Sequence, residues 1–298
     1  MRFDGKVVVV TGAGGGVGRG YALELARRGA KLVVNDLGGA IDGTGGSDAA
    51  ASRVVKEIEA LGAEAVANFD SVASFEGGQK IIDTALDRFG ACDILIANAG
   101  ILRDKSFAKL EVPDLEAVLD VHLTGAFSTA QPAFRHMKDH GGGKIIFTTS
   151  SSGLFGNFGQ TNYTAAKMGI WGLMRSVSIE GARGNVQANC VAPVAATRLT
   201  GGEDETSPMS PHRVAPIVVA LCHESCDITG ETFMAGNNWY TRCFMAQAPG
   251  WAAPEDAEVT PEDVVAHWDE IRATAGFGEV DNALLSMARL AEIRGGGE

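Results

Sequence analysis

The sequence predicts an α/β protein built on one doubly wound sheet of seven parallel strands, followed by a C-terminal helical extension. Three observations predict this fold class. Short runs of β-branched and other apolar residues recur through the first part of the chain, segments of helical length separate them, and small or polar residues follow each run. Continuous apolar strands that alternate with helices are typical of parallel sheets covered on both faces.

The seven apolar runs are the predicted strands, and the segments between them are the predicted helices. The strands are expected at residues 6–12, 31–36, 64–70, 93–100, 144–150, 186–193 and 231–236. Helices are expected between them, including residues 47–62, 113–137 and 159–181. Each crossover between parallel strands is expected to be right-handed. Together these elements predict a single domain over residues 1–240.

The remaining residues, 241–298, differ in character and predict an extension. The stretch up to Thr260 has the composition of a loop. Thr260, Pro261 and Asp263 then supply a capping residue, a proline at the first helical position and an acid in the first turn, which together indicate a helix start. Residues 281–294 have apolar side chains at helical spacing. We expect these helices to pack on the domain or on a partner subunit.

Composition excludes several classes of protein. The chain is 45 % hydrophobic and 21 % charged, and its net charge of −12 disfavours binding to nucleic acid. No apolar run approaches the roughly 20 residues of a membrane span. The start lacks the pattern of a signal peptide, and the ending IRGGGE is no peroxisomal address. Five cysteines without a disulfide framework indicate a reducing compartment, so a cytoplasmic protein is expected.

The stretch from Cys222 to Cys226 invites comparison with a metal site. A second pair of ligands at zinc-like spacing is absent from the sequence. We therefore predict no metal.

A glycine-rich loop follows the first predicted strand and opens the next helix. Glycines there permit a tight turn and let a pyrophosphate approach the backbone at the helix N-terminus, where free N–H groups favour anions. The placement of the loop predicts a Rossmann-type dinucleotide site. Its predicted cofactor contacts are Gly12, Gly14, Gly15, Gly16, Val17 and Gly18.

Acidic residues end the second and third strands. Asp36 lies 36 − 18 = 18 positions beyond Gly18, where a carboxylate accepts hydrogen bonds from the adenosine ribose and repels a 2′-phosphate. This favours NAD over NADP. Asp70, with Ser71 and Val72, follows the third strand, where an acid can bind the adenine amino group. An ordinary turn is an equally good explanation of Asp70.

Polar residues also end the fourth and fifth strands and enter the helix that follows. Asn98, Ala99 and Gly100 close the fourth strand, and Ser150 closes the fifth. Tyr163 follows Ser150 by 163 − 150 = 13 residues, and Lys167 follows Tyr163 by four. Side chains four apart in a helix project from one face.

These motifs resemble those of the short-chain dehydrogenase/reductase family over roughly residues 4–240. The marks are TGAGGGVG, the NAG after strand four, the serine before YTAAK, and the step from Pro193 to Thr197 after strand six. VVNDLGG, VHLTGAF, SSGLFGNFGQTNYTAAKMG, CHES and GNNW resemble more closely the (3R)-hydroxyacyl-CoA dehydrogenase domains of the peroxisomal multifunctional enzymes type 2, also called 17β-hydroxysteroid dehydrogenases type 4. Those proteins carry further domains, so we expect a free-standing, bacterial-type relative.

The resemblance implies roles for the site residues. Tyr163 would be the base, and the Lys167 ammonium with the positive nicotinamide would bring down the pKa of its phenol, which is ordinarily near ~10. Ser150 would bond the substrate oxygen, and Lys167 would also bridge to the nicotinamide ribose. Thr197 would bond the nicotinamide carboxamide, although Val194 replaces the glycine usual in that step.

One position departs from the family pattern. Most members place an asparagine before strand five to hold a water in a proton relay, and here His122 stands in its place. We expect His122 to hold the relay water or to transfer a proton itself, with a pKa near neutrality. A buried histidine that only supports the helix is the alternative.

Three functions remain open. The first is an NAD-dependent dehydrogenase that converts a (3R)-hydroxyacyl-CoA to a 3-ketoacyl-CoA. The second is the same chemistry on a steroid alcohol or on a steroid side-chain CoA thioester. The third, a nucleotide-binding regulator without turnover, is disfavoured by the complete set of Ser150, Tyr163 and Lys167.

The substrate side is less determined by the sequence. Candidate cations for the phosphates of coenzyme A are Arg19, Arg103, Lys105 and Arg198, although a residue of this kind is more often a solvated surface charge. Residues 194–212 are expected to form a lid, and residues 157–160 to shape the mouth of the site or only to turn the chain. Helices 113–137 and 159–181 form the dimer surface in most members of the family, so a homodimer is expected, with a tetramer as a further option.

Overall fold

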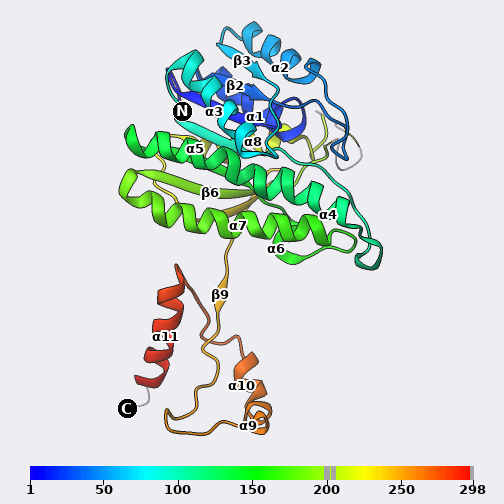
Figure 1. Ribbon diagram of the computed structural model, residues 1–298. Coiled ribbons are helices and arrows are strands. Elements are labelled where there is room, and N and C mark those ends of the chain that lie inside the picture. Colours follow the sequence, from blue (N-terminus) through cyan, green and yellow to red (C-terminus); the bar gives the residue numbers. More distant parts are fainter. Residues whose placement is uncertain (198–201, 203–205, 296–298) are drawn as a thin grey trace. The chain divides into compact units, whose positions relative to one another are not determined.

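Figure 1 presents the computed structural model, which describes residues 1–197, 202 and 206–295. The chain divides into two compact units, Met1–Arg242 and Cys243–Glu298. Among the described residues, no helix has the length and apolar character needed to cross a membrane.

The first unit is built around an eight-stranded sheet with the order β3-β2-β1-β4-β5-β6-β7-β8. All seven strands predicted from the sequence are present and pair in parallel. They are β1 (Val7–Thr11), β2 (Lys31–Asn35), β3 (Ala65–Asn68), β4 (Ile94–Ala97), β5 (Gly143–Thr148), β6 (Val186–Pro193) and β7 (Thr232–Gly236). The prediction of a doubly wound α/β domain is confirmed.

The eighth strand, β8 (Trp239–Cys243), was not predicted. Asn237 and Asn238 connect it to β7, and both have positive φ angles, of 50° and 58°. Two consecutive residues in the left-handed region make a type I′ hairpin turn, for which asparagine is well suited. The sheet therefore ends on an antiparallel edge strand. The predicted seven parallel strands are all present, and β8 is the one strand that the prediction of a parallel sheet omitted.

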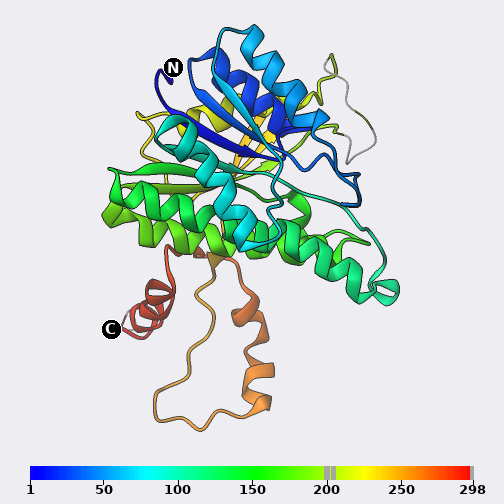
Figure 2. The same cartoon turned by 45° about the horizontal axis from the view of Figure 1, so that its top comes forward.

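Helices cover both faces of the sheet (Figures 1 and 2). One face packs against α1 (Gly16–Arg27), α2 (Ala49–Ala60) and α8 (Ala215–Cys222), and the other against α3 (Phe75–Phe89), α5 (Gly125–Asp139) and α7 (Thr161–Gly181). Alternate residues of each strand serve the two cores: Val8 and Val10 face the first, whereas Val7 and Val9 face the second. Because both faces are buried, the strands are apolar throughout.

The predicted helix 113–137 is interrupted by a π-helical turn. It consists of α4 (Val112–Leu119), the turn η2 (Asp120–Thr124) and α5, and His122 lies within η2. A π turn inserts one residue into the helical repeat and often marks a functional site. Here it places His122 toward the ends of the strands.

The strand order reverses between β1 and β4. To one side of β1 lie β2 and β3, and to the other side β4 and the later strands. In open α/β sheets this switch point opens a crevice beyond the carboxyl ends of the strands. Shorter elements that follow the carboxyl ends of strands are η1 (Phe107–Lys109), α6 (Ser151–Phe155) and η5 (Pro211–Arg213), whereas η3 (Ala182–Gly184) directly precedes β6 at its amino end.

The second unit contains the predicted helices and a small sheet that was not predicted. Its elements are β9 (Ala246–Gln247), α9 (Pro261–Ala266), α10 (Trp268–Arg272), β10 (Gly278–Glu279) and α11 (Ala283–Gly295). Thr260 and Asp263 form a reciprocal capping box at the start of α9, as expected from their spacing. Strands β9 and β10 pair antiparallel over two residues each, which is too short for an alternation of apolar residues to reveal.

Candidate active site

A pocket of ≈ 640 Å³ opens beyond the carboxyl ends of the strands at the switch point. It is lined by all the predicted site residues except Gly14 and Gly18. The lining comprises Gly12, Gly15, Gly16, Val17, Asp36, Asp70, Ser71, Val72, Asn98, Ala99, Gly100, His122, Ser150, Tyr163, Lys167, Pro193 and Thr197. The fold thus brings together residues that are far apart in the sequence.

The glycine-rich loop shapes one end of the pocket. Gly12 has a φ of 64°, and a Cβ there would lie 2.7 Å from the Cα of Ala99, so the ends of β1 and β4 can approach only because Gly12 lacks a side chain. Beyond it α1 begins at Gly16, which lines the pocket, so the N-terminal end of the helix lies at the pocket. This arrangement suits the pyrophosphate of a dinucleotide.

Gly14 and Gly18 serve packing instead of lining the pocket. A Cβ on Gly14 would lie 2.7 Å from Oδ2 of Asp36, and one on Gly18 would lie 2.3 Å from the carbonyl oxygen of Gly12. The sequence could not separate these two glycines from those that line the pocket, because the same motif requires both kinds.

Asp36 is held in place by two backbone N–H groups. Its Oδ2 accepts a hydrogen bond from the amide of Gly14 at 2.8 Å, and its Oδ1 accepts one from Gly38 at 2.7 Å. A carboxylate oxygen has more than one acceptor site, so both oxygens can still accept hydrogen bonds from the hydroxyl groups of a ribose. Asp70 is braced similarly, since its Oδ2 accepts a hydrogen bond from Nδ2 of Asn68 at 2.8 Å.

Asn98 ties the end of β4 to the glycine-rich loop. Its Nδ2 donates to the carbonyl oxygens of Thr11 and Gly12 at 3.0 and 3.1 Å, and the amides of Asn98 and Ala99 donate to Oγ1 of Thr11. The switch point is therefore cross-linked by side chains as well as by the sheet.

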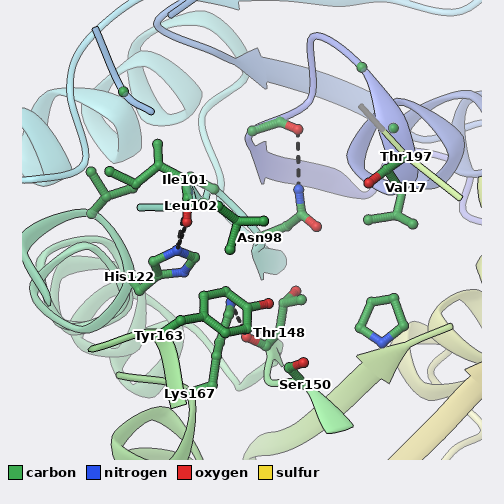
Figure 3. A pocket seen from close by; sticks show the side chains of 18 of the residues that line it. Val17, Asn98, Ile101, Leu102, His122, Thr148, Ser150, Tyr163, Lys167 and Thr197 are labelled. Atoms are coloured by element: carbon green, nitrogen blue, oxygen red, sulfur yellow. Dashed lines mark hydrogen bonds between the residues drawn. The ribbon is translucent and has the colours of Figure 1, made fainter. Parts of the chain in front are cut away.

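Ser150, Tyr163 and Lys167 lie together in the pocket (Figure 3). Nζ of Lys167 donates to the carbonyl oxygen of Thr148 at 2.7 Å and lies 5.6 Å from the centre of the Tyr163 ring. Oγ of Ser150 accepts a hydrogen bond from the amide of Ser152 at 3.2 Å and so caps α6. The carbonyl of Thr148 was not predicted as part of the site, because no side-chain pattern marks a main-chain acceptor.

Burial governs the electrostatics of this trio. It raises the pKa of the Tyr163 phenol, against the opposing effect of a hydrogen bond with Ser150. It also lowers the pKa of Lys167 to about 7 from its ordinary 10.5. For the protein groups by themselves, desolvation thus outweighs the favourable contacts. The expected lowering of the Tyr163 pKa includes the positive nicotinamide, and it stays a prediction.

His122 is buried between Ile101 and Tyr163. Its Nε2 lies 2.8 Å from the carbonyl oxygen and 3.1 Å from the amide nitrogen of Ile101, and its ring meets the Tyr163 ring edge-on with centroids 5.2 Å apart. The shorter contact favours the tautomer in which Nε2–H donates to the carbonyl, which leaves Nδ1 as an acceptor. Nδ1 makes no hydrogen bond to any residue that the structure describes.

The expected near-neutral pKa of His122 is wrong. Burial, reinforced by the charge of Lys167, places the pKa of the imidazole well below its ordinary value. His122 is thus neutral at physiological pH. Gly100 is matched to it, because a Cβ on Gly100 would lie 2.4 Å from Cε1 of His122. No short motif could have revealed that Gly100 makes room for this ring.

The candidate cations of the substrate side have carboxylate partners. Arg19 pairs with Glu57 at 2.6 Å, whereas Lys105 and Arg103 both pair with Asp114, at 2.8 and 3.5 Å. Arg198 lies outside the described residues, as do residues 198–201 and 203–205 of the expected lid. The described part of that segment includes Met209, which lines the pocket, and Asn157 and Gln160 line it as well.

Comparisons with known proteins agree with this geometry. The family model described as short chain dehydrogenase matches residues 6–207. The peroxisomal multifunctional enzyme type 2 of Mus musculus is 46 % identical over 275 residues, which are 91 % of this chain and 37 % of the mouse enzyme. The chain therefore spans little more than a third of that relative.

Two solved structures are also similar. The full-length peroxisomal multifunctional enzyme type 2 from Drosophila melanogaster superposes with a TM-score of 0.83 at 40 % identity, covering 98 % of this chain and 50 % of that one. A 7α-hydroxysteroid dehydrogenase complexed with NADH and 7-oxo glycochenodeoxycholic acid superposes with a TM-score of 0.71 at 26 % identity, covering 79 % and 94 %.

Proposed function

The chain belongs to the short-chain dehydrogenase family and is an oxidoreductase that uses a nicotinamide cofactor, and on that premise we propose that it oxidises a (3R)-hydroxyacyl-CoA to the 3-ketoacyl-CoA with NAD. One observation carries the proposal. Ser150, Tyr163 and Lys167 meet in the same pocket as the glycine-rich loop and Asp36, so a dinucleotide site and a proton-transfer site are continuous.

The choice of NAD over NADP rests on Asp36. Its carboxylate is fixed by the amides of Gly14 and Gly38, and it lines the pocket. Such a group accepts hydrogen bonds from both ribose hydroxyls and repels a 2′-phosphate. The adenine would lie against Asp70, Ser71 and Val72. The nicotinamide half would lie against Asn98, Ala99, Gly100, Pro193 and Thr197.

The protein residues would manage the proton of the substrate alcohol. When bound, NAD supplies the hydride acceptor. Ser150 would donate a hydrogen bond to the substrate oxygen, and Tyr163 as phenolate would take the hydroxyl proton. Because burial raises the pKa of Tyr163, the phenolate requires positive charge nearby, and the Lys167 ammonium would provide part of it. The carbonyl of Thr148 holds Nζ of Lys167 in place at 2.7 Å.

We propose that His122 takes part in the relay as a neutral acceptor. A pKa well below the ordinary value makes an imidazolium intermediate costly, so a proton step through the ring itself is disfavoured. Nδ1, which is buried, remains available to accept a hydrogen bond from a water beside Lys167. If His122→Ala leaves the turnover and its pH profile as in the wild type, His122 is only a packing residue.

The acyl-CoA substrate is carried over from the relatives. The chain covers 30 % of the yeast peroxisomal hydratase-dehydrogenase-epimerase at 45 % identity, and 37 % of the mouse multifunctional enzyme. The 26 % identical steroid dehydrogenase supports the second candidate, oxidation of a free hydroxysteroid or of a steroid side-chain thioester.

A substrate panel separates the two candidates. Purified protein would be assayed for NADH formation with 3-hydroxyacyl-CoA esters of several chain lengths, with hydroxysteroids, and with NADP in place of NAD. We expect the highest kcat/KM with a hydroxyacyl-CoA and NAD. A higher value with a free steroid alcohol would overturn the first candidate, and NAD binding without oxidation of any alcohol would favour the regulator.

We further propose that residues 1–240 contain all the residues that carry out the reaction. We also propose that the protein forms a homodimer whose interface is made by α5 and α7. Phe127 on α5 and Ile179 on α7 are 42 % and 54 % exposed, which provides apolar surface for such an interface. Light scattering would give twice the chain mass, and a monodisperse monomer would contradict this proposal.

A further inference from the structure

A glycine-rich segment of residues 37–47, here called the clasp loop, joins β2 to α2 and lines the pocket through Leu37, Gly39, Ala40 and Gly43. Its two ends are tied together, because the amide of Ser47 donates to the carbonyl of Leu37 at 2.9 Å. The loop directly follows Asp36, so it belongs to the adenosine end of the proposed cofactor site.

The clasp loop contacts residues 101–103, which follow β4 and of which Ile101 and Leu102 also line the pocket. The amide of Leu102 donates to the carbonyl of Ile41 at 2.9 Å, and Nε of Arg103 donates to the carbonyl of Asp42 at 2.8 Å. Ile101 packs on Gly43, where a Cβ would lie only 3.0 Å from its Cδ1. All three residues of the segment therefore contact the loop.

Residues 101–103 also contact His122 directly and Tyr163 through Asn162. The backbone of Ile101 fixes Nε2 of His122, as Figure 3 shows. The carbonyl of Arg103 accepts a hydrogen bond from Nδ2 of Asn162 at 3.0 Å, and Oδ1 of Asn162 accepts one from the amide of Tyr163 at 2.8 Å. Asn162 is 1 % exposed, so this link is shielded from water.

Arg103 is the side chain that secures this arrangement. One edge of its guanidinium bonds the clasp loop at Asp42, and Nη1 pairs with Asp114 at 3.5 Å, near the start of α4. Arginine suits this position because its planar group directs several donors at fixed angles. Lys105 pairs with the same Asp114, but none of its described contacts reaches the clasp loop.

We propose that Arg103 is a positioning residue that clamps the clasp loop onto residues 101–103, and thereby couples the seating of NAD to the alignment of His122 and Tyr163. The proposal rests on the proposed cofactor site. In this proposal Arg103 stabilises the arrangement of the site and does not bind the phosphates of coenzyme A. The clasp loop then links the proposed cofactor site to the residues that hold His122 and Tyr163.

The test is NADH binding by fluorescence titration, with no acyl substrate present, in Arg103→Met and in the matched control Lys105→Met. Loss of a charge-assisted hydrogen bond should weaken NADH binding by about fivefold to tenfold in Arg103→Met. Lys105→Met should bind NADH as the wild type does, and both should melt near the wild-type temperature. Arg103→Lys, which retains one donor group and the charge, should recover part of the affinity.

Activity on a truncated thioester separates the alternatives. With an N-acetylcysteamine 3-hydroxyacyl thioester, which lacks the phosphates, Arg103→Met should still show a lower kcat/KM and an altered pH profile. Unchanged NADH binding would overturn the proposal. A defect confined to the full CoA ester would also overturn it, and would make Arg103 a ligand of the phosphates. If no hydroxyacyl thioester is oxidised by the wild type, the proposed substrate is wrong, but the NADH titration still decides the role of Arg103.

A second pair of variants tests the loop without removing a charge. Gly43 and Gly45 both have positive φ, of 85° and 71°, but only a Cβ on Gly43 would meet Ile101. Gly43→Ala and Gly45→Ala therefore impose similar backbone strain and differ in this contact. We expect a larger loss of NADH affinity and of kcat in Gly43→Ala, and equal losses would contradict a path through Ile101.

Discussion

Replacing Lys167 by methionine should stabilise the protein at neutral and acidic pH while it removes a proposed catalytic group. Lys167 is only 3 % exposed, and burial lowers its pKa to about 7 from 10.5. A charged ammonium in this position is therefore a cost to the folded state. Methionine has a similar length and no charge to desolvate.

The size and sign of the effect follow from the shift in pKa. A depression of 10.5 − 7, about 3.5 units, corresponds to about 5 kcal/mol as an order of magnitude. Because the pKa is lower in the folded state, the unfolded chain binds more protons between about pH 7 and pH 10.5, and wild-type stability rises with pH across that window. The penalty is complete below the window and absent above it.

Methionine also loses the hydrogen bond from Nζ to the carbonyl of Thr148, which contributes roughly 1–2 kcal/mol. The net gain should thus be about 3 kcal/mol below pH 7, and it should vanish between about pH 9 and pH 10.

Urea denaturation of protein prepared without nucleotide would measure this difference at about pH 6, 7.5 and 9. Lys105→Met is a suitable control because Lys105 is a surface residue whose pKa is raised by Asp114. If Lys167→Met is no more stable than the wild type at about pH 6, or if its advantage does not shrink with pH, the assigned burial cost is wrong.

Three further substitutions address the proposed roles. Tyr163→Phe removes the proposed base, so turnover should fall by at least ~10²-fold while NADH titration remains near wild type, and retained turnover would contradict the role. Asp36→Ser removes the carboxylate that faces the proposed ribose site, and we expect the KM for NAD to rise by about tenfold and the NADP-to-NAD ratio of kcat/KM to increase; an unchanged ratio would show that Asp36 does not select the cofactor. Gly100→Ala places a Cβ 2.4 Å from Cε1 of His122 and should reproduce the kinetic defect of His122→Ala. Wild-type turnover in this variant would show that the reaction does not depend on the position of the His122 ring.

Much of the fold could be predicted because the strands of a parallel sheet are apolar on both faces. The runs around Val8, Leu32, Leu95 and Ile145 are continuous, and all become buried strands. The eighth strand escaped prediction because residues 239–243 form an exposed edge without such a run. The π turn at His122 also left no sign, because it changes the helical repeat over five residues without a glycine or proline within it.

The residues that line the pocket could largely be predicted, but the structural role of each residue within the site could not. Glycines at 14, 18 and 100 look like cofactor contacts in sequence, yet each leaves room for a specific neighbouring atom. The main chain of Ile101 and Thr148 supplies hydrogen bonds that no residue type encodes. The direction of the Tyr163 and His122 pKa shifts depends on burial, which emerges only when the helices and strands are assembled.

The most direct test of the proposed function compares the two enantiomers of one 3-hydroxyacyl-CoA as substrates with NAD. Initial NADH formation would be followed for the wild type and for Tyr163→Phe under the same conditions. We expect the wild type to oxidise the (3R) ester and not the (3S) ester, and Tyr163→Phe to oxidise neither at a comparable rate. Oxidation of the (3S) ester, or of a free hydroxysteroid with no turnover of either CoA ester, would contradict the proposed activity.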